Sequence, residues 1–173
     1  LEFRRVLFRS EYDSSVQYVF RDWAAHGTLD FNGAIARSSD VYFYELAGGY
    51  REFAGLGADR IARYARAFGL GATTGLDLPS EAAGLVPDPA WKRRTIGDAW
   101  VLGDTYTFGI GQGYLTATPL QMAVATAAIA NGGEVLQPRV VAITRGLDGA
   151  HPTARVVRGR VPADPQHLAQ VRT

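Results

Sequence analysis

The sequence has no cysteine and only one lysine among its 173 residues. The absence of cysteine excludes disulfide scaffolds, cysteine-ligated zinc sites and thiol catalysis. All the other basic residues are arginines, so a mechanism that needs a lysine base must use Lys92 or a lysine outside this chain.

A strong net charge and long apolar runs are also lacking. The formal net charge of +1 gives no electrostatic argument for binding nucleic acid. No stretch approaches the ~20 apolar residues that a membrane-spanning helix needs. Hydrophobic residues at 47% and charged residues at 20% are ordinary values for a folded domain. The length fits one domain, or one contiguous piece of a larger domain.

The first ten residues are interpreted as foreign to the protein. Residues 6–10 have the sequence VLFRS, which resembles the translated end of a widely used sequencing adapter. The alternative is a short native strand or helix that is both basic and apolar. We therefore predict that residues 1–10 are a non-native, adapter-derived segment and that residues 11–173 are a partial domain.

Capping residues and apolar periodicity predict three helices. Asp30 can cap a helix over about residues 31–38 through its side chain. Residues 58–68 carry apolar side chains at positions i, i+3, i+4 and i+7, as in an amphipathic helix. Residues 118–121 form a capping box with proline in the first turn. The helix that follows is apolar nearly all round as far as Ala130, which predicts burial on most of its faces.

The rest of the chain has weaker signals. Residues 11–29 indicate a loop with one strand, and residues 41–47 leave helix or strand open before a pair of glycines. Residues 71–116 are rich in glycine, proline and threonine, which predicts a long irregular connection of the kind that is often functional. Residues 140–144 predict a strand, and residues 144–173 a charged loop.

Two motifs that suggest ligand binding have ordinary structural alternatives. Residues 109–113 resemble a phosphate-binding glycine loop, but the dinucleotide fingerprint needs glycine where Tyr114 stands. A tight turn packed close to a neighbouring element is therefore favoured. Asp22 and His26 are four residues apart and could form an acid–base pair or bind a metal, but a structural role for the histidine is favoured.

Aromatic residues are concentrated in the first part of the chain, where they could form a stacking platform. Core packing is the commoner use of such side chains and is the favoured interpretation. The residues are Tyr18, Phe20, Trp23, Tyr42, Phe43, Tyr44 and Trp100.

The triplet Ser38-Ser39-Asp40 marks a possible polar site, although a triplet of this kind is a weak signal alone. A Ser/His/Asp hydrolase is poorly supported, because the chain has no Gly-x-Ser-x-Gly motif. Local reasoning therefore predicts a helix-rich α/β or α+β fragment with a polar site near Ser38.

Several motifs together resemble one known family. The triplet at residue 38 is followed, in order and at suitable spacing, by further short motifs. These are TGLDLP at 74–79, GDT at 103–105 and GIGQGYLTATPLQ at 109–121. The set resembles the transpeptidase domain of class B penicillin-binding proteins over about residues 12–145. Within that family it is most similar to the cell-elongation enzymes, the penicillin-binding protein 2 subfamily.

The resemblance implies an α/β (α+β) fold of the penicillin-binding and β-lactamase type. This chain would be a helix-rich part of it that lacks strands of the central sheet. It also implies a parent enzyme, a peptidoglycan D,D-transpeptidase that cross-links stem peptides ending in D-Ala-D-Ala through an acyl-serine. A partial domain is expected to expose apolar surface and to dissolve poorly when expressed alone.

The family uses three motifs, S-x-x-K, S-x-N and K-T-G. Ser38 matches the serine of S-x-N, and its hydroxyl can both donate and accept a proton. Asp40 stands at the asparagine position, where an ionised carboxylate only accepts and so suits a lysine ammonium or a substrate N–H. The aspartate form resembles elongation-type members more than division-specific ones. Lys92 belongs to neither lysine motif, so the resemblance places both outside this chain.

Some relatives resemble this region but hold a metal there. They use aspartate and histidine residues like Asp22 and His26, with a cysteine at the middle position of S-x-N. That position is Ser39 here. We therefore expect no zinc site and no other cofactor.

The resemblance also implies partners and a location for the parent protein. Partners would be stem peptides, β-lactams and a glycosyltransferase of the elongation machinery, with no nucleic acid. The domain would lie on the periplasmic side of the inner membrane, with an anchor outside this chain. Alternatives are a penicillin-binding sensor or resistance receptor, a catalytically inactive scaffold, and the division-specific transpeptidase.

We predict that this 173-residue chain alone forms no covalent adduct with penicillin, because it contains neither S-x-x-K nor K-T-G. Intact-protein mass spectrometry after incubation with penicillin should show only the unmodified mass. A stable mass increase that maps to any serine of the chain would contradict this prediction.

Overall fold

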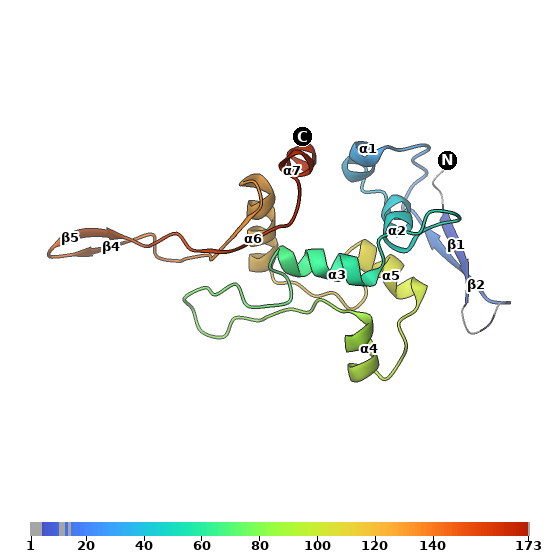
Figure 1. Ribbon diagram of the computed structural model, residues 1–173, viewed down its shortest axis with the longest axis horizontal. Helices are drawn as coiled ribbons and strands as arrows, with labels where there is room; N and C mark the ends of the chain where they lie inside the picture. Colours follow the sequence, from blue (N-terminus) through green and yellow to red (C-terminus); the bar gives the residue numbers. More distant parts are fainter. Residues whose placement is uncertain (1–4, 11–12, 14, 173) are drawn as a thin grey trace. The chain divides into compact units, whose positions relative to one another are not determined.

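The computed structural model describes residues 5–10, 13 and 15–172, which form two compact units. The first unit comprises residues 1–62 and 87–115, and the second comprises residues 63–86 and 116–173. Figure 1 shows the order of helices and strands along the chain. Among the described residues, no helix has the length and apolarity needed to cross a membrane.

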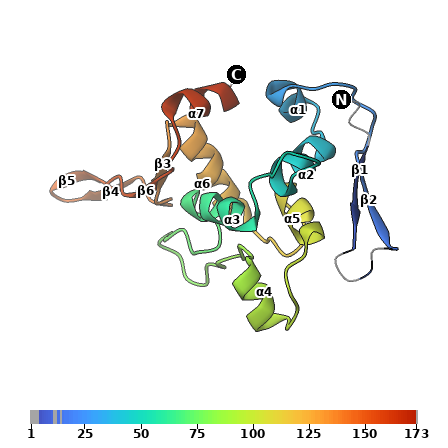
Figure 2. The same cartoon turned by 45° about the vertical axis from the view of Figure 1, so that its right-hand side comes forward.

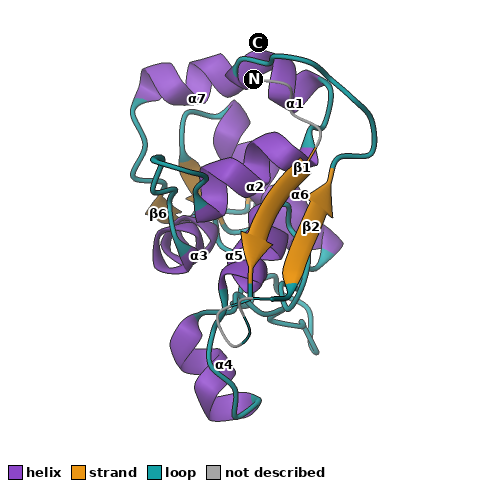
Figure 3. Cartoon of the chain, turned by 90° about the vertical axis from the view of Figure 1, so that its right-hand side faces the viewer, coloured by secondary structure: helices purple, strands orange, loops and turns teal. Residues whose placement is uncertain are grey.

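The first unit combines one strand pair with short helices. Strands β1 and β2 are antiparallel, with Leu7 opposite Val19, and they are drawn as neighbouring arrows in Figure 3. Helix α3 begins in this unit and continues into the second. The elements are β1 (Arg5–Arg9), β2 (Gln17–Arg21), α1 (Phe31–Ala36), α2 (Asp40–Gly48), α3 (Ala58–Ala67), α4 (Pro89–Thr95) and α5 (Leu102–Gly109).

The second unit holds one longer helix, two strand pairs and a short helix. Strand β3 pairs with β6 and β4 pairs with β5, both antiparallel. The elements are α6 (Pro119–Ala130), β3 (Glu134–Leu136), β4 (Ile143–Gly146), β5 (Gly149–Pro152), β6 (Val157–Arg160) and α7 (Pro165–Val171). Helices with separate two-stranded sheets agree with the predicted partial α/β (α+β) domain.

The backbone of Arg5–Arg9 pairs with β2, although these residues belong to the segment interpreted as adapter-derived. Strand pairing uses backbone groups that every such sequence carries, so it is independent of the origin of the residues. The non-native origin of residues 1–10 stays a prediction.

The core of the first unit lies between α2 and α5, which run side by side (Figure 2). Val41 and Tyr44 pack against Tyr106, and the Phe20 ring makes edge contacts with both tyrosines, at centroid distances of 5.2 Å. The interpretation of the aromatic residues as core is confirmed for Phe20 and Tyr44. It is wrong for Tyr18 and Trp23, which are 49% and 69% exposed.

Glycine allows α2 and α5 to approach closely. A Cβ added at Gly109 would overlap the Cβ of Ala47 on α2. Gly111 and Gly113 then turn the chain with φ values of 76° and 74°, which non-glycine residues rarely adopt. Residues 109–113 are therefore a tight turn packed against a neighbour, as predicted.

The core of the second unit forms around α6. Val124 and Ala128 pack with Val135 and Val161. Gln121 is fully buried, and its amide nitrogen donates to the carbonyls of residues 72 and 83, each at 2.7 Å. Its amide oxygen accepts from the backbone N–H of Thr118 at 2.9 Å, which completes the predicted capping box.

The predicted helix at residues 31–38 is present as α1, and the one at 58–68 as α3. Asp30 caps α1 by accepting from the N–H of Gly33 at 2.7 Å. The open choice at residues 41–47 is resolved as helix, since these residues lie within α2.

The prediction of an irregular connection over residues 71–116 is wrong, because α4 and α5 lie within it. Helix α4 starts with an ordinary signal, in which Asp88 accepts from the N–H of Trp91 at 2.8 Å and Pro89 takes the first turn. Helix α5 has no capping side chain at Val101, and instead Asp104 reaches back to its N–H at 2.8 Å.

Three further expectations are corrected in the second unit. Helix α6 buries one face, whereas Met122 is 51% exposed, because only positions 121, 124, 125 and 128 face the core. The strand expected at 140–144 begins at Ile143. Residues 144–173 form strands and a helix where a loop was expected. Their strands β4, β5 and β6 are exposed along their whole length and so lack an apolar alternation.

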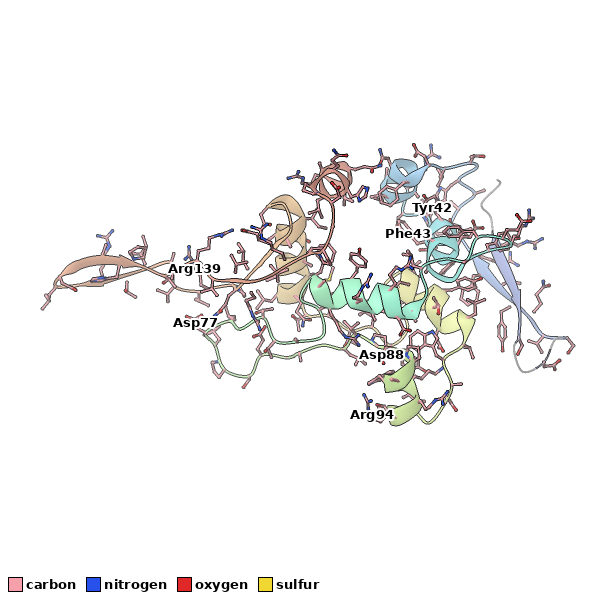
Figure 4. All side chains as sticks on the ribbon, in the orientation of Figure 1. Tyr42, Phe43, Asp77, Asp88, Arg94 and Arg139 are labelled. Atoms are coloured by element: carbon pink, nitrogen blue, oxygen red, sulfur yellow. The ribbon has the colours of Figure 1, made fainter. Side chains whose placement is uncertain are left out.

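Lys92 forms a buried ion pair between α4 and α5. Its ammonium lies 2.6 Å from Asp104 Oδ2, and the two side chains are 8% and 15% exposed. Burial lowers the pKa of Lys92, but the hydrogen bond and the charge of Asp104 outweigh burial, so the pKa is raised and the lysine stays charged. Figure 4 marks α4 by Asp88 at its start and Arg94 in its last turn.

We expect Lys92→Met to destabilise the complete transpeptidase domain of the parent protein by about 3 kcal/mol, because it leaves Asp104 buried without its counter-charge. The exposed neighbour Arg93 provides the matched control, and Arg93→Met should change stability by less than about 0.5 kcal/mol. Urea unfolding of the three proteins measures the difference. Equal midpoints for both variants would refute a stabilising ion pair.

Candidate functional site

The polar triplet predicted from the sequence lies at the start of α2. Ser39 is the N-cap residue and is fully buried, and its hydroxyl accepts from the N–H of Tyr42 at 3.4 Å. Ser38, one residue earlier, is exposed, and Asp40, the first residue of the helix, is half-buried. The fold therefore buries the middle residue of the triplet. Ser38 is accessible to a ligand, and Asp40 is partly accessible.

Ser38 has an unusual backbone conformation, with φ at +51°. This left-handed region costs a non-glycine residue of order 1 kcal/mol, so it persists only where neighbouring groups hold it. The N–H of Ser38 donates to the carbonyl of Ile35 at 3.1 Å, and its carbonyl accepts from Trp23 Nε1 at 3.0 Å. Both backbone polar groups of Ser38 are thus bound.

The carboxylate of Asp22 binds the first turn of α2. Asp22 follows β2 directly and its side chain is fully buried. It accepts from the Ser39 hydroxyl at 2.6 Å and from the N–H groups of Asp40 and Val41 at 3.3 and 3.2 Å. A carboxylate at this position satisfies free amides and interacts favourably with the positive end of the helix.

His26 completes this buried polar group. Its Nε2 lies 3.4 Å from Asp22 Oδ1, and its ring meets that of Trp23 edge-on at 5.1 Å. The structure thus brings Asp22 and His26 together. Nε2 of His26 is buried and makes no hydrogen bond to any of the residues described here.

The donor set around Asp22 does not fit zinc. Within the described ranges, no group of three or more histidine, cysteine, aspartate or glutamate residues is positioned to hold a metal. Besides His26, the side chain that contacts the Asp22 carboxylate is the hydroxyl of Ser39, and protein zinc sites are built from thiolate, imidazole and carboxylate ligands. The absence of a metal stays a prediction.

The environment of Asp40 disfavours its negative charge. Burial raises the pKa of Asp40, and the nearby charge of Asp22 raises it further, while His26 opposes the shift. The site therefore offers an exposed hydroxyl that donates or accepts a proton and a carboxyl group that accepts when ionised. The single lysine of the sequence is the partner of Asp104, so this chain contributes no lysine side chain to the site.

Sequence reasoning missed how Asp22 and Trp23 contact the triplet. The spacing of Asp22 and His26 suggested only their mutual contact, whereas the two carbonyl groups that accept from the indole N–H of Trp23 lie 14 and 15 residues later. No local pattern of capping or periodicity reports contacts at such separations.

An exposed Ser38, a buried Ser39 and a half-buried Asp40 thus stand at the start of a helix, in a fold of short helices and small antiparallel sheets. Residues 3–173 match the penicillin binding protein transpeptidase domain, and the chain belongs to that family. The resemblance predicted from the sequence is confirmed.

Individual relatives include MrdA and PBP2 proteins. The chain is 46% identical over 129 residues to the peptidoglycan D,D-transpeptidase MrdA of Acinetobacter baumannii, covering 73% of this chain and 18% of that protein. Among solved structures, it resembles PBP2 of Pseudomonas aeruginosa in complex with WCK 5153, with 34% identity and a TM-score of 0.75. That match covers 98% of this chain and 36% of the other.

A third similar protein is PBP2 of Helicobacter pylori in complex with MreC, with 28% identity and a TM-score of 0.74. The match covers 99% of this chain and 29% of that one. The sequence thus spans about a third of the solved chains and less than a fifth of the curated MrdA protein.

We predict that Asp40→Asn changes the pH dependence of stability of the complete domain. Because the folded-state pKa of Asp40 is raised, ionisation costs stability as pH rises above the ordinary aspartate value of 3.8. The melting temperature of the variant relative to wild type should therefore rise between about pH 3 and about pH 7. A relative fall over that range would mean that the positive end of α2 outweighs burial.

Proposed function

We propose that the parent protein is a serine-type peptidoglycan D,D-transpeptidase of cell elongation and that this chain supplies the second motif of its active site. The observation that carries the proposal is the exposed Ser38 hydroxyl at the buried start of α2, within a chain of the transpeptidase family. The MrdA and PBP2 relatives and the aspartate at position 40 support the subfamily.

The reaction is acyl transfer in two steps. A serine of S-x-x-K, outside this sequence, attacks the carbonyl carbon of the penultimate D-alanine, the serine C–O bond forms, and the C–N bond to the last D-alanine breaks. An amine of a neighbouring stem peptide then attacks the ester, which forms the new C–N bond and releases the serine. A β-lactam enters the first step and blocks the serine by its own acyl group.

Ser38 acts in proton transfer. Its hydroxyl accepts a proton from one side and donates to the other, so it can pass a proton from the nucleophile and its lysine to the departing amine. Asp40, when ionised, accepts from a lysine ammonium or from a substrate N–H. The buried Ser39 between them holds the pair on the first turn of α2.

Partners and location follow from this chemistry. The substrates are stem peptides of peptidoglycan, which lie outside the cytoplasmic membrane, so the domain works on the periplasmic side of an anchored parent protein. A glycosyltransferase that makes the glycan strands is the expected partner. The Helicobacter pylori relative in complex with MreC supports a place in a larger assembly.

The test uses the complete parent protein and a fluorescent penicillin. We predict that Ser38→Ala lowers the rate of covalent labelling about 100-fold, as expected for loss of a proton-transfer group. Ser80→Ala is the matched control, because Ser80 is also an exposed serine with positive φ, at 64°. The control should label at the wild-type rate.

Two outcomes would contradict the proposal in different ways. Wild-type labelling by Ser38→Ala would remove Ser38 from the mechanism. A parent protein that binds penicillin but releases no D-alanine from stem peptides would be a sensor or receptor, and the transpeptidase assignment would be wrong.

A further inference from the structure

The two residues after β2 hold the Ser38 segment from both sides. We infer that Asp22 and Trp23 are positioning residues that keep Ser38 in its left-handed conformation and thereby aim its hydroxyl. This inference rests on the proposed function of Ser38 in proton transfer. Neither residue needs to touch the substrate for this role.

The contacts of Trp23 lie at the end of α1. Its Nε1 donates to the carbonyl of Ser38 at 3.0 Å and to that of Arg37 at 3.2 Å. Arg37 is the C-cap residue of α1, where carbonyl groups have no partner within the helix. The side chain is 69% exposed, so the contribution of Trp23 comes from this donated N–H more than from burial.

The contacts of Asp22 lie on the other side of Ser38. Its carboxylate binds the Ser39 hydroxyl and the next two backbone N–H groups, at 2.6 to 3.3 Å. The N–H of Ser39 in turn donates to the carbonyl of Ala34 at 3.0 Å. Trp23 thus fixes the peptide group that Ser38 shares with Ser39, and Asp22 fixes the turn that follows.

Because Ser38 is in the left-handed conformation, the contacts of Asp22 and Trp23 determine the position of its hydroxyl. At φ of +51° the backbone is held in a region that non-glycine residues rarely adopt. Rotation about φ moves Cβ and the hydroxyl relative to the rest of the chain. Proton transfer requires heavy atoms within about 2.6–3.2 Å, and a displacement of ~1 Å can cost about 100-fold in rate.

The test compares variants of the complete parent protein in the reaction with penicillin. Trp23→Phe removes the indole N–H and keeps a ring beside His26. The maximal acylation rate should fall about tenfold, while the dissociation constant of the non-covalent penicillin complex stays within about twofold. Trp91→Phe, on α4, is the matched control and should leave the rate unchanged.

A double-mutant cycle separates positioning from a general structural role. If Trp23 acts through Ser38, Trp23→Phe should have no further effect on the rate in the Ser38→Ala background. Asp22→Asn is the second variant, because it removes the charge of the side chain and keeps its shape. It should likewise have no further effect on the rate in the Ser38→Ala background. Independent, multiplying losses would overturn the inference.

The outcomes also separate this inference from the proposed function. A large effect of Ser38→Ala combined with wild-type acylation by both Trp23→Phe and Asp22→Asn would overturn the inference alone. Wild-type acylation by Ser38→Ala would overturn both, because no positioned hydroxyl would then be needed.

Discussion

The carboxylate of Asp22 at the start of α2 is the interaction on which the candidate site depends. It satisfies two amides that the helix leaves free and binds the hydroxyl of the capping serine. Because this carboxylate is buried, the hydrogen bonds compensate its desolvation, and the same bonds join the end of β2 to the first turn of α2. The exposed Ser38 is presented next to this buried junction.

The three consecutive residues of the triplet differ in burial and in structural role. Ser39 is buried and caps the helix, whereas Ser38 is exposed and has a strained backbone. Asp40 is half-buried, and its surroundings disfavour its negative charge. The close packing of α2 on α5, made possible by glycine where a side chain would collide, gives the rigid support that such a site needs. Ser38, which the proposed chemistry uses, is one of the residues whose backbone conformation is strained.

The sequence alone predicted the helices whose starts and faces depend on residues a few positions apart. Asp30, the apolar stripe of α3 and the capping box at Thr118 each act within a few residues, and each was recognisable. Helix α4 carried an equally ordinary start at Asp88, overlooked among the glycines and prolines around it. The junction of Asp22 with Ser39 was not predictable, since it joins residues 17 apart through a fold that no local pattern specifies.

The burial of Lys92 in an ion pair has a consequence for chemical labelling. The only lysine of these 173 residues is buried, and its raised pKa keeps it protonated and therefore poorly nucleophilic. Reagents that acylate lysine side chains should leave this part of the folded protein unmodified. Lysine labels on the native parent protein would then report on regions outside these 173 residues.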